Sequence, residues 1–527
     1  MAAHDVIVIG AGHNGLVAAA TLARAGRNVL LLESRHQVGG AAVTEEPWPG
    51  FRVSTCAGGA GYLAPEISRD LKLAEHGLEF LPSEVVAFCP KPDGSALTLW
   101  RDPQRAAAEI GSISAADAES YPRFVELMGK IAGVVGGLAR ATPPALPHLG
   151  WQDLATLPKL AGPVRRLGRK NVNELLRVLP MSVADLLNEW FESDAVKGAL
   201  AAGGVRDITW GPKEAGTAYV LLYYWALSNS GNFRSAGQVK GGMGALTSAL
   251  AASARSLGAE IRTESPVARV ELTQGRATGV LLESGEKLAA NVVLSSAPPR
   301  TTFVELLEPR LLSATLVKHV GNIKYRGSAA RLHLALSGLP EFTAAGTDGE
   351  ERLRGAIQIA PSVNYLQRAY ECTKYGEFSP RPFLDIRIPT LADPDLAPAG
   401  QHLMSITVKY APYALGEGSW QERGEALAEA TLDTLAEYAP KIRDQILQQQ
   451  VLTPADLEAT FGLPEGNGNH GEMTLDQFFH MRPIPGHARY STPVDGLYLC
   501  GAGSHPGGGV TGIPGLNAAR EVLKGGK

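Results

Sequence analysis

Cysteine is scarce in this chain, which has only four in 527 residues. No two of them are separated by two residues, so the sequence lacks a redox CxxC pair, and four are too few for a dense disulfide framework. We therefore expect free thiols in a reducing compartment. The four residues are Cys56, Cys89, Cys372 and Cys500.

The chain also lacks a strong excess of charge and any long apolar run. Its 49 Lys and Arg against 53 Asp and Glu give a net charge of −4, which argues against a nucleic-acid surface. The best apolar run, residues 218–227, is about half of what a membrane-spanning helix needs. The first strand-like run begins within five residues of Met1, so we expect no signal peptide and a cytoplasmic protein.

One basic stretch, residues 157–171, leaves a membrane contact open. It contains leucines, prolines and five cations without an acidic residue. Such a segment suits a peripheral contact with anionic lipid, and it equally suits a solvated helix face. The five cations are Lys159, Arg165, Arg166, Arg169 and Lys170.

Glycine, by contrast, is abundant, and its placement near the N-terminus is informative. An apolar run at 6–9 is followed by Gly10, Gly12 and Gly15 in the pattern G-x-G-x-x-G. A second apolar run at 29–32 ends in Glu33. This order predicts a strand, a tight turn beside a pyrophosphate, a helix, and an acid for the ribose hydroxyls. Glu33 would repel a 2′-phosphate, which leaves FAD and NAD as candidates.

The residues after Glu33 resemble a known family. Glu33, Arg35, Gly39 and Gly40 form Glu-x-Arg-x-x-x-Gly-Gly, which is similar to the FAD-binding segment of the flavin amine oxidase and phytoene desaturase superfamily. The resemblance implies FAD as cofactor and an α/β fold, with a Rossmann-like FAD-binding domain and an α+β substrate domain. It also implies that Val267 contacts the adenine through its backbone.

Changes of pattern along the chain predict two discontinuous domains. The FAD-binding domain is expected at residues 1–75, 236–305 and 485–527, and the substrate-binding domain at 76–235 and 306–484. The GGMG at 241–244 lacks the spacing of a second dinucleotide motif, so we expect one dinucleotide site only. Electrons would then pass to oxygen, a quinone or another acceptor.

The C-terminal segment carries a second glycine motif. An apolar run at 497–499 precedes Gly501 and Gly503, and a helix is expected to begin near Ile513 with its positive end toward the flavin. The run from Gly501 through His505 to Val510 resembles the C-terminal signature of carotenoid desaturases. With the stretch before it, this segment is similar to the pyridine nucleotide-disulfide oxidoreductase domain-containing protein 2 group. The resemblance places Val510 at the cofactor.

Three residues are candidates for catalysis. His505 would lie near the flavin ring and orient substrate or exchange a proton, or it would only support the glycine turn. Glu472 is a candidate acid or base, or a surface carboxylate. Arg482 would pair with such a carboxylate or with the flavin, or form a structural ion pair. His480 and His487 have no partner at metal-ligand spacing, so no metal is expected.

These observations predict an FAD-dependent oxidoreductase that dehydrogenates a largely apolar small organic substrate by hydride transfer to non-covalent FAD. Two alternatives remain open at this point. One is a carotenoid desaturase, ketolase or isomerase. The other is a non-catalytic protein that keeps the FAD fold as an interaction or regulatory module. We expect a monomer or a homodimer.

Overall fold

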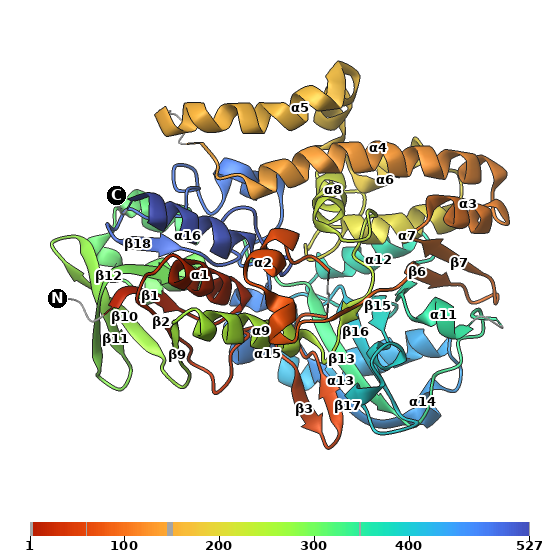
Figure 1. Cartoon of the computed structure of the whole chain (residues 1–527). Coiled ribbons are helices and arrows are strands. Elements are labelled where there is room, and N and C mark those ends of the chain that lie inside the picture. Colours follow the sequence, from red (N-terminus) through yellow and green to blue (C-terminus); the bar gives the residue numbers. More distant parts are fainter. Residues whose placement is uncertain (1–3, 59–60, 145–150, 347–348, 526–527) are drawn as a thin grey trace.

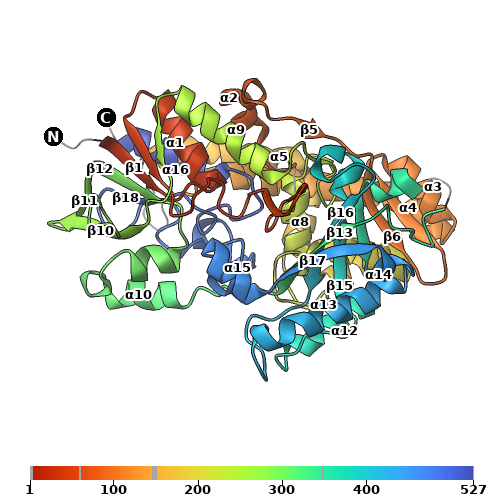
Figure 2. The ribbon, with the colours of Figure 1, turned by 90° about the horizontal axis from the view of Figure 1, so that it is seen from below.

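The computed structural model describes residues 4–58, 61–144, 151–346 and 349–525, without the side chains of 151–161 and 163 (Figure 1). Its strands form two seven-stranded sheets and two small two-stranded sheets. Figures 1 and 2 place the first sheet toward one end of the molecule and the second sheet toward the other. The two-stranded sheets pair β3 (Glu45–Trp48) with β4 (Phe51–Val53) and β5 (Phe80–Leu81) with β8 (Gln238–Val239).

The first sheet is assembled from distant parts of the chain. Its parallel part joins β9, β2, β1, β12 and β18, and β10 and β11 continue it as an antiparallel meander on β12. The bounds are β1 (His4–Ile9), β2 (Val29–Leu32), β9 (Glu260–Arg262), β10 (Val267–Thr273), β11 (Arg276–Leu282), β12 (Lys287–Ser295) and β18 (Leu497–Leu499). The N-terminal and C-terminal glycine motifs therefore follow strands of the same sheet.

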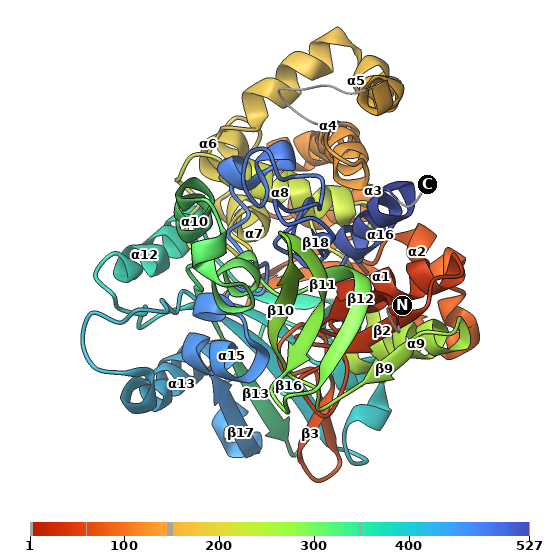
Figure 3. The same cartoon turned by 90° about the vertical axis from the view of Figure 1, so that its left-hand side faces the viewer.

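Both faces of this sheet are covered, which explains the continuous apolar run of β1. Val6 and Val8 belong to the core on one face, and Ile7 and Ile9 belong to the core on the other. The first core includes α1 (His13–Arg24), α9 (Met243–Ser256) and α16 (Ile513–Gly525). The second includes α10 (Ala314–Gly321). Figure 3 shows α1, α9 and α16 on one side of these strands and α10 on the other.

The second sheet is mixed and belongs to the middle of the chain. Its order is β17-β13-β16-β15-β14-β6-β7, with only β14 and β6 parallel. The bounds are β6 (Val85–Pro90), β7 (Ala96–Trp100), β13 (Ala329–Leu336), β14 (Ala356–Ile359), β15 (Phe383–Arg387), β16 (His402–Lys409) and β17 (Ile446–Leu452). A Rossmann-like sheet beside a mixed substrate-side sheet confirms the predicted fold class.

The remaining helices lie around these two sheets, and several of them build the upper part of the molecule in Figure 1. They are α2 (Pro65–Asp70), α3 (Pro103–Gly111), α4 (Ala115–Arg140), α5 (Trp151–Val178), α6 (Val183–Asn188), α7 (Asp194–Gly204), α8 (Thr217–Leu227), α11 (Gly349–Leu353), α12 (Val363–Thr373), α13 (Trp420–Ala436), α14 (Ile442–Gln445) and α15 (Pro454–Phe461). None of the helices in the described ranges is long and apolar enough to cross a bilayer.

The basic stretch at 157–171 lies in α5, which runs along the outside of α4 in Figure 1. Gly168 interrupts this helix with φ 79° and ψ 154°. The side chain of Lys159 lies outside the described residues. The other four cations are exposed, which keeps both a lipid contact and a solvated face compatible with the structure: Arg165, Arg166, Arg169 and Lys170.

Candidate active site

A cavity of about 560 Å³ opens where the turn after β1 meets the end of β2. Seven of the residues predicted to bind the dinucleotide line it. The wall also includes residues of the loop after β12 and of the end of α15. We call it the nucleotide cavity. The seven predicted residues in its wall are Gly10, Gly12, Glu33, Arg35, Gly39, Gly40 and Val267.

The glycines of the first motif have different physical reasons to be glycine. A Cβ on Gly15 would lie 2.0 Å from the backbone oxygen of Gly10, so Gly15 allows the helix to pack against the turn. Gly12 has an ordinary φ of −64°, and a Cβ there would meet no atom within 4 Å. A Cβ added to Gly40 would lie 3.2 Å from the Gly12 Cα, so Gly40 allows the two loops to approach closely. At Gly12 itself, neither the backbone conformation nor the surrounding protein atoms require a glycine, and the space beside it belongs to the cavity.

Glu33 is buried at the cavity wall, and its carboxylate organises the turn. Oε2 accepts a 2.8 Å hydrogen bond from the Ala11 N–H, and Oε1 accepts a 3.0 Å bond from the Arg35 N–H. The Arg35 guanidinium forms a 2.6 Å ion pair with Glu45 and lies 4.9 Å from the Phe461 ring centroid. The charge of Arg35 is thus matched within the protein, and its guanidinium forms part of the wall.

Two polar atoms at this wall lack partners in the described part of the chain. They are Asn14 Oδ1, in the first turn of α1, and Nδ1 of His470. Burial lowers the pKa of His470 to about 3, so its imidazole is neutral. Unpaired buried polar atoms beside the N-terminus of a twelve-residue helix fit a bound dinucleotide, which would supply hydrogen-bond partners and negative charge.

The C-terminal motif contributes packing as well as cavity wall. Cβ atoms on Gly501 and Gly503 would lie 2.2 Å from the Ser296 oxygen and 2.3 Å from Pro299 Cδ, so both glycines allow the loops to pack. Only Ala502, between them, lines the nucleotide cavity. Ile513 is buried and begins α16 as predicted. It is absent from the wall of the nucleotide cavity, so its part is to start the helix.

A second cavity of about 130 Å³ continues from the nucleotide cavity and shares four wall residues with it. We call it the central cavity. Val510 lines it with a φ of 56°, a strained conformation for a β-branched residue and one that clusters at functional sites. Small and apolar residues form much of the remaining wall, among them Ala41, Ala42, Ala57, Leu457, Leu463, Gly508 and Gly509.

His505 does not occupy the predicted place at the cofactor. It is fully buried, its Nε2 lies 3.0 Å from the Leu138 carbonyl oxygen, and its ring meets Phe479 edge-to-face at 5.3 Å. It lines neither the nucleotide cavity nor the central cavity. Burial lowers its pKa to about 4. Because its imidazole packs against the end of α4, the geometry favours the structural alternative for His505.

Arg482 and Glu472 are both buried, but they do not pair with each other. Arg482 donates to the backbone oxygens of Asn469, Gly471, Glu472 and Ala502, and burial lowers its pKa. The prediction that Arg482 pairs with a carboxylate is therefore wrong, because the loop carbonyls occupy its guanidinium. The Glu472 carboxylate forms an ion pair with Arg326, which lines the central cavity. Glu472 is thus a buried residue behind the cavity wall, and the surface alternative for it is wrong.

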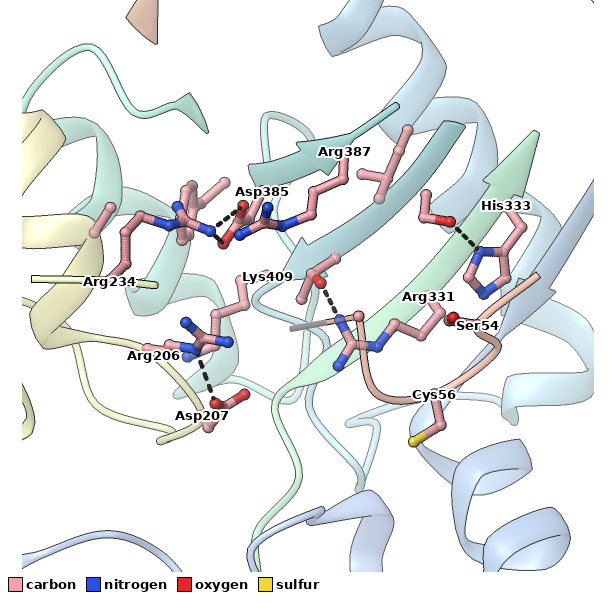
Figure 4. Close-up of a pocket in the computed structure, with 16 residues that line it drawn as sticks. Ser54, Cys56, Arg206, Asp207, Arg234, Arg331, His333, Asp385, Arg387 and Lys409 are labelled. Atoms are coloured by element: carbon pink, nitrogen blue, oxygen red, sulfur yellow. Dashed lines mark hydrogen bonds and ion pairs between the residues drawn. The ribbon is translucent and has the colours of Figure 1, made fainter. Parts of the chain in front are cut away.

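Beyond the central cavity lies a pocket of about 80 Å³ that the sequence analysis missed. Figure 4 shows its charged side chains converging from β13, β15 and β16 and from the segment around Arg206. The central cavity and this pocket share five wall residues: Cys56, Gly58, Arg206, Asp207 and Arg331. The three spaces therefore adjoin one another, in a row from Glu33 at one end to Arg387 at the other.

The register of the second sheet explains how this pocket forms. Arg331 pairs with Thr407, which pairs with Asp385, and His333 pairs with Ser405, which pairs with Arg387. These residues alternate with buried apolar ones, so one face of three neighbouring strands is polar and the other lies in the core. The core-facing residues include Leu332, Leu334, Leu384, Ile386, Met404, Ile406 and Val408.

The sequence carried a signal for this polar face. In residues 331–336, 383–387 and 404–409, the even-numbered residues are apolar and most odd-numbered ones are polar or charged, apart from Phe383 and Ala335. Alternation alone, however, also describes a strand with one face in solvent. The signal becomes specific only when the register shows that three such strands are neighbours.

A model of the family described as flavin containing amine oxidoreductase matches residues 15–523. The chain belongs to this family. Pyridine nucleotide-disulfide oxidoreductase domain-containing protein 2 from Rattus norvegicus is 39% identical over 99% of this chain and 93% of its own length. Phytoene desaturase (lycopene-forming) from a Paracoccus species is 25% identical over 99% of this chain and 97% of its own.

Among solved structures, an oxidoreductase from Methanosarcina mazei has a TM-score of 0.62 at 19% identity and covers 99% of this chain and 100% of that chain. This likeness shows the fold. Together with the family match, it confirms the sequence interpretation that the protein is an FAD-dependent oxidoreductase. The described residues contain no cluster of three His, Cys, Asp or Glu that could hold a metal ion.

Proposed function

We propose that this family member holds FAD non-covalently along the nucleotide cavity and the central cavity, and dehydrogenates a small organic substrate at the junction of the central cavity and the pocket beyond it. The single observation that supports this most strongly is that the three spaces adjoin one another. A nucleotide cavity with a glycine turn at one end leads, through a wall of small residues, to a polar pocket at the other.

The residues of the nucleotide cavity suit the adenosine and pyrophosphate of FAD. The free N–H groups of the first turn of α1 and its dipole would face the pyrophosphate beside Gly12. Glu33 retains free lone pairs for ribose hydroxyls after its two backbone hydrogen bonds. Val267 lies where the ring of an adenine could rest against β10.

The central cavity suits the flavin ring. Bound FAD supplies the hydride acceptor and the electron storage that the side chains lack. The residues around it would position a substrate and exclude water, since small and apolar residues form much of the wall between its charged groups. Arg326, held by Glu472, is a cation at this wall and would favour negative charge there.

The size of the substrate space disfavours the carotenoid alternative. The central cavity and the pocket have volumes of about 130 and 80 Å³, which are small against a C40 polyene. The complete glycine turn and its open cavity favour an enzyme over the non-catalytic alternative. The expectation of a largely apolar substrate suits the central cavity and does not suit the charged pocket.

The test is the visible spectrum of the purified protein, followed by anaerobic reduction with dithionite and exposure to air. We expect stoichiometric flavin that acid precipitation releases, because Cys500 is buried and no covalent link is proposed. Fast reoxidation would indicate an oxidase, and slow reoxidation a dehydrogenase that needs a quinone or another acceptor. A colourless protein that FAD cannot reconstitute would refute the proposal.

A further inference from the structure

The pocket at the far end of the substrate path has more positive than negative side chains. Its wall contains four arginines and a lysine against two aspartates. We call it the cationic pocket. These are Arg206, Arg234, Arg331, Arg387 and Lys409, with Asp207 and Asp385. Its histidine, His333, adds no charge near neutral pH, because burial lowers its pKa to about 4.

Both aspartates already have partners. Asp385 accepts two 3.0 Å hydrogen bonds from one Arg234 nitrogen and lies between Arg234 and Arg387 in Figure 4. Asp207 pairs with Arg206 at 3.2 Å and accepts a 2.8 Å bond from the Tyr224 hydroxyl. Within the described ranges, neither Arg331 nor Arg387 forms an ion pair with a carboxylate.

These two arginines are also short of neutral partners. Arg331 donates one hydrogen bond to the Thr407 hydroxyl, and its buried Nε has no partner in the described part of the chain. For Arg387, no hydrogen bond or ion pair is found among the described residues. Burial and the neighbouring Arg234 lower the pKa of Arg387 to about 10, so it stays protonated at neutral pH. The nearby Asp385 opposes this shift, but its carboxylate is hydrogen-bonded to Arg234.

Both guanidinium groups are half-buried and line the pocket, where positive side chains outnumber negative ones. This local excess of positive charge favours an anion in the pocket, and the planar donors suit a carboxylate. The FAD phosphates cannot be this anion, since the turn predicted to bind them lines the nucleotide cavity at the other end of the path.

The pocket adjoins the cavity proposed to hold the flavin ring. Arg206, Asp207 and Arg331 line both the central cavity and the cationic pocket. A molecule at this boundary would place its charged end between Arg331 and Arg387 and its carbon skeleton toward the flavin ring. With about 80 Å³, the pocket has room for a carboxylate and a few carbons.

We propose that Arg331 and Arg387 bind the carboxylate of the substrate, and that the enzyme oxidises small organic acids whose reacting C–H bond lies in the central cavity. This inference rests on the proposed function and deepens it. It replaces the expectation of a largely apolar substrate with an amphiphilic one. In this account, Arg234 and Arg206 hold the aspartates, and the two unpaired arginines hold the ligand.

The test uses the flavin-loaded protein and benzoate as the probe, with benzyl alcohol as the neutral analogue of the same ring and inorganic phosphate as a second anion. Binding is followed by the change in flavin absorbance and by calorimetry. We expect benzoate to bind, benzyl alcohol to bind at least ten-fold more weakly, and phosphate not to perturb the flavin spectrum.

Two variants locate the binding. Arg387→Met keeps an unbranched side chain that reaches about as far as the arginine Nε and removes the guanidinium charge, and we expect it to weaken benzoate binding at least ten-fold with unchanged flavin content. The matched control is Arg354→Met, because Arg354 is exposed and pairs with Glu350 on the surface. The control variant should bind benzoate like the natural protein.

The outcomes separate the two proposals. Protein without flavin contradicts the proposed function. Flavin-loaded protein that binds benzoate and benzyl alcohol equally overturns the carboxylate site, and so does binding of phosphate in place of benzoate. An Arg387→Met protein that shifts the flavin reduction potential but binds benzoate normally would assign Arg387 to the cofactor. If Arg387→Met fails to fold, the comparison of the three probes on the natural protein still decides.

Discussion

Gly12→Asp is the substitution that separates cofactor binding from folding. Gly12 has φ −64° and ψ 167°, which any residue adopts, and a Cβ at this position meets no atom within 4 Å. The aspartate should therefore be accommodated without a steric clash. Its carboxylate would project into the nucleotide cavity beside the first turn of α1, where the pyrophosphate of FAD is proposed to lie.

The expected effect follows from charge repulsion. At a separation of about 5 Å and an effective dielectric constant of about 20, two like charges repel by about 3 kcal/mol. Each 1.4 kcal/mol corresponds to about ten-fold in affinity, so one phosphate charge alone weakens FAD binding by about 100-fold. The second phosphate charge and the lost space add to this effect.

The assay is titration of the apoprotein with FAD, followed by the quenching of flavin fluorescence, beside urea unfolding of the same apoprotein. Gly12→Ala is the matched variant: it should leave apoprotein stability unchanged or raise it by up to about 1 kcal/mol, and it should weaken FAD binding less than aspartate does. Gly12→Asp protein that unfolds normally and binds FAD with full affinity would refute the placement of the pyrophosphate.

Three further predictions concern buried groups. His505→Ala removes the hydrogen bond to Leu138 and the contact with Phe479, so it should lower the free energy of unfolding by about 2–4 kcal/mol. Turnover and the flavin spectrum should stay unchanged, and a specific loss of turnover would restore a catalytic role for His505. Arg326→Ala leaves the buried Glu472 carboxylate unpaired and should lower the free energy of urea unfolding by about 2–3 kcal/mol. Adding Glu472→Gln should recover most of that loss, whereas losses that simply add in the double variant would contradict the pairing. Acidification from pH 6.5 to 4 should lower the free energy of unfolding, because the buried histidines, among them His13, His333, His470 and His505, have pKa values near 6.5 in the unfolded chain and of about 3 to about 4 in the folded chain. His333 contributes about 3 kcal/mol of this loss, so His333→Gln should make the pH profile shallower by that share, and an unchanged profile would contradict the lowered pKa of His333.

The nucleotide end of the molecule could be predicted because its signals are local. The run at 6–9, the glycine turn and Glu33 lie within 28 residues, and each reports a backbone requirement that adjacent residues impose. The strand at 497–499 and the helix from Ile513 are equally local. The predicted domain boundaries and the assignment of each residue to FAD stay predictions, which the reconstitution experiment with Gly12→Asp begins to test.

The catalytic candidates were harder to place, because their roles depend on contacts between distant segments. His505 follows the glycine turn closely in sequence, but its side chain contacts Leu138, which lies 367 residues away along the chain. Arg482 is ten residues from Glu472, yet its guanidinium is occupied by loop carbonyls, and Glu472 pairs with Arg326, 146 residues before it. Their proximity in sequence correctly indicated that these residues lie in one region, but it did not indicate the groups that each side chain contacts.

The cationic pocket shows why substrate class is the last property that a sequence yields. Each of its strands, taken alone, is an alternating strand with a polar face, and most such faces meet solvent. Here the register places Arg331, Thr407 and Asp385 in one row and His333, Ser405 and Arg387 in the next. Together with the segment around Arg206, this sheet gathers scattered charges into one pocket, where Arg331 and Arg387 form no ion pair with any described residue. The net charge of −4 for the whole chain conceals that local excess, because a ligand responds to the charges around its cavity rather than to their sum over the protein.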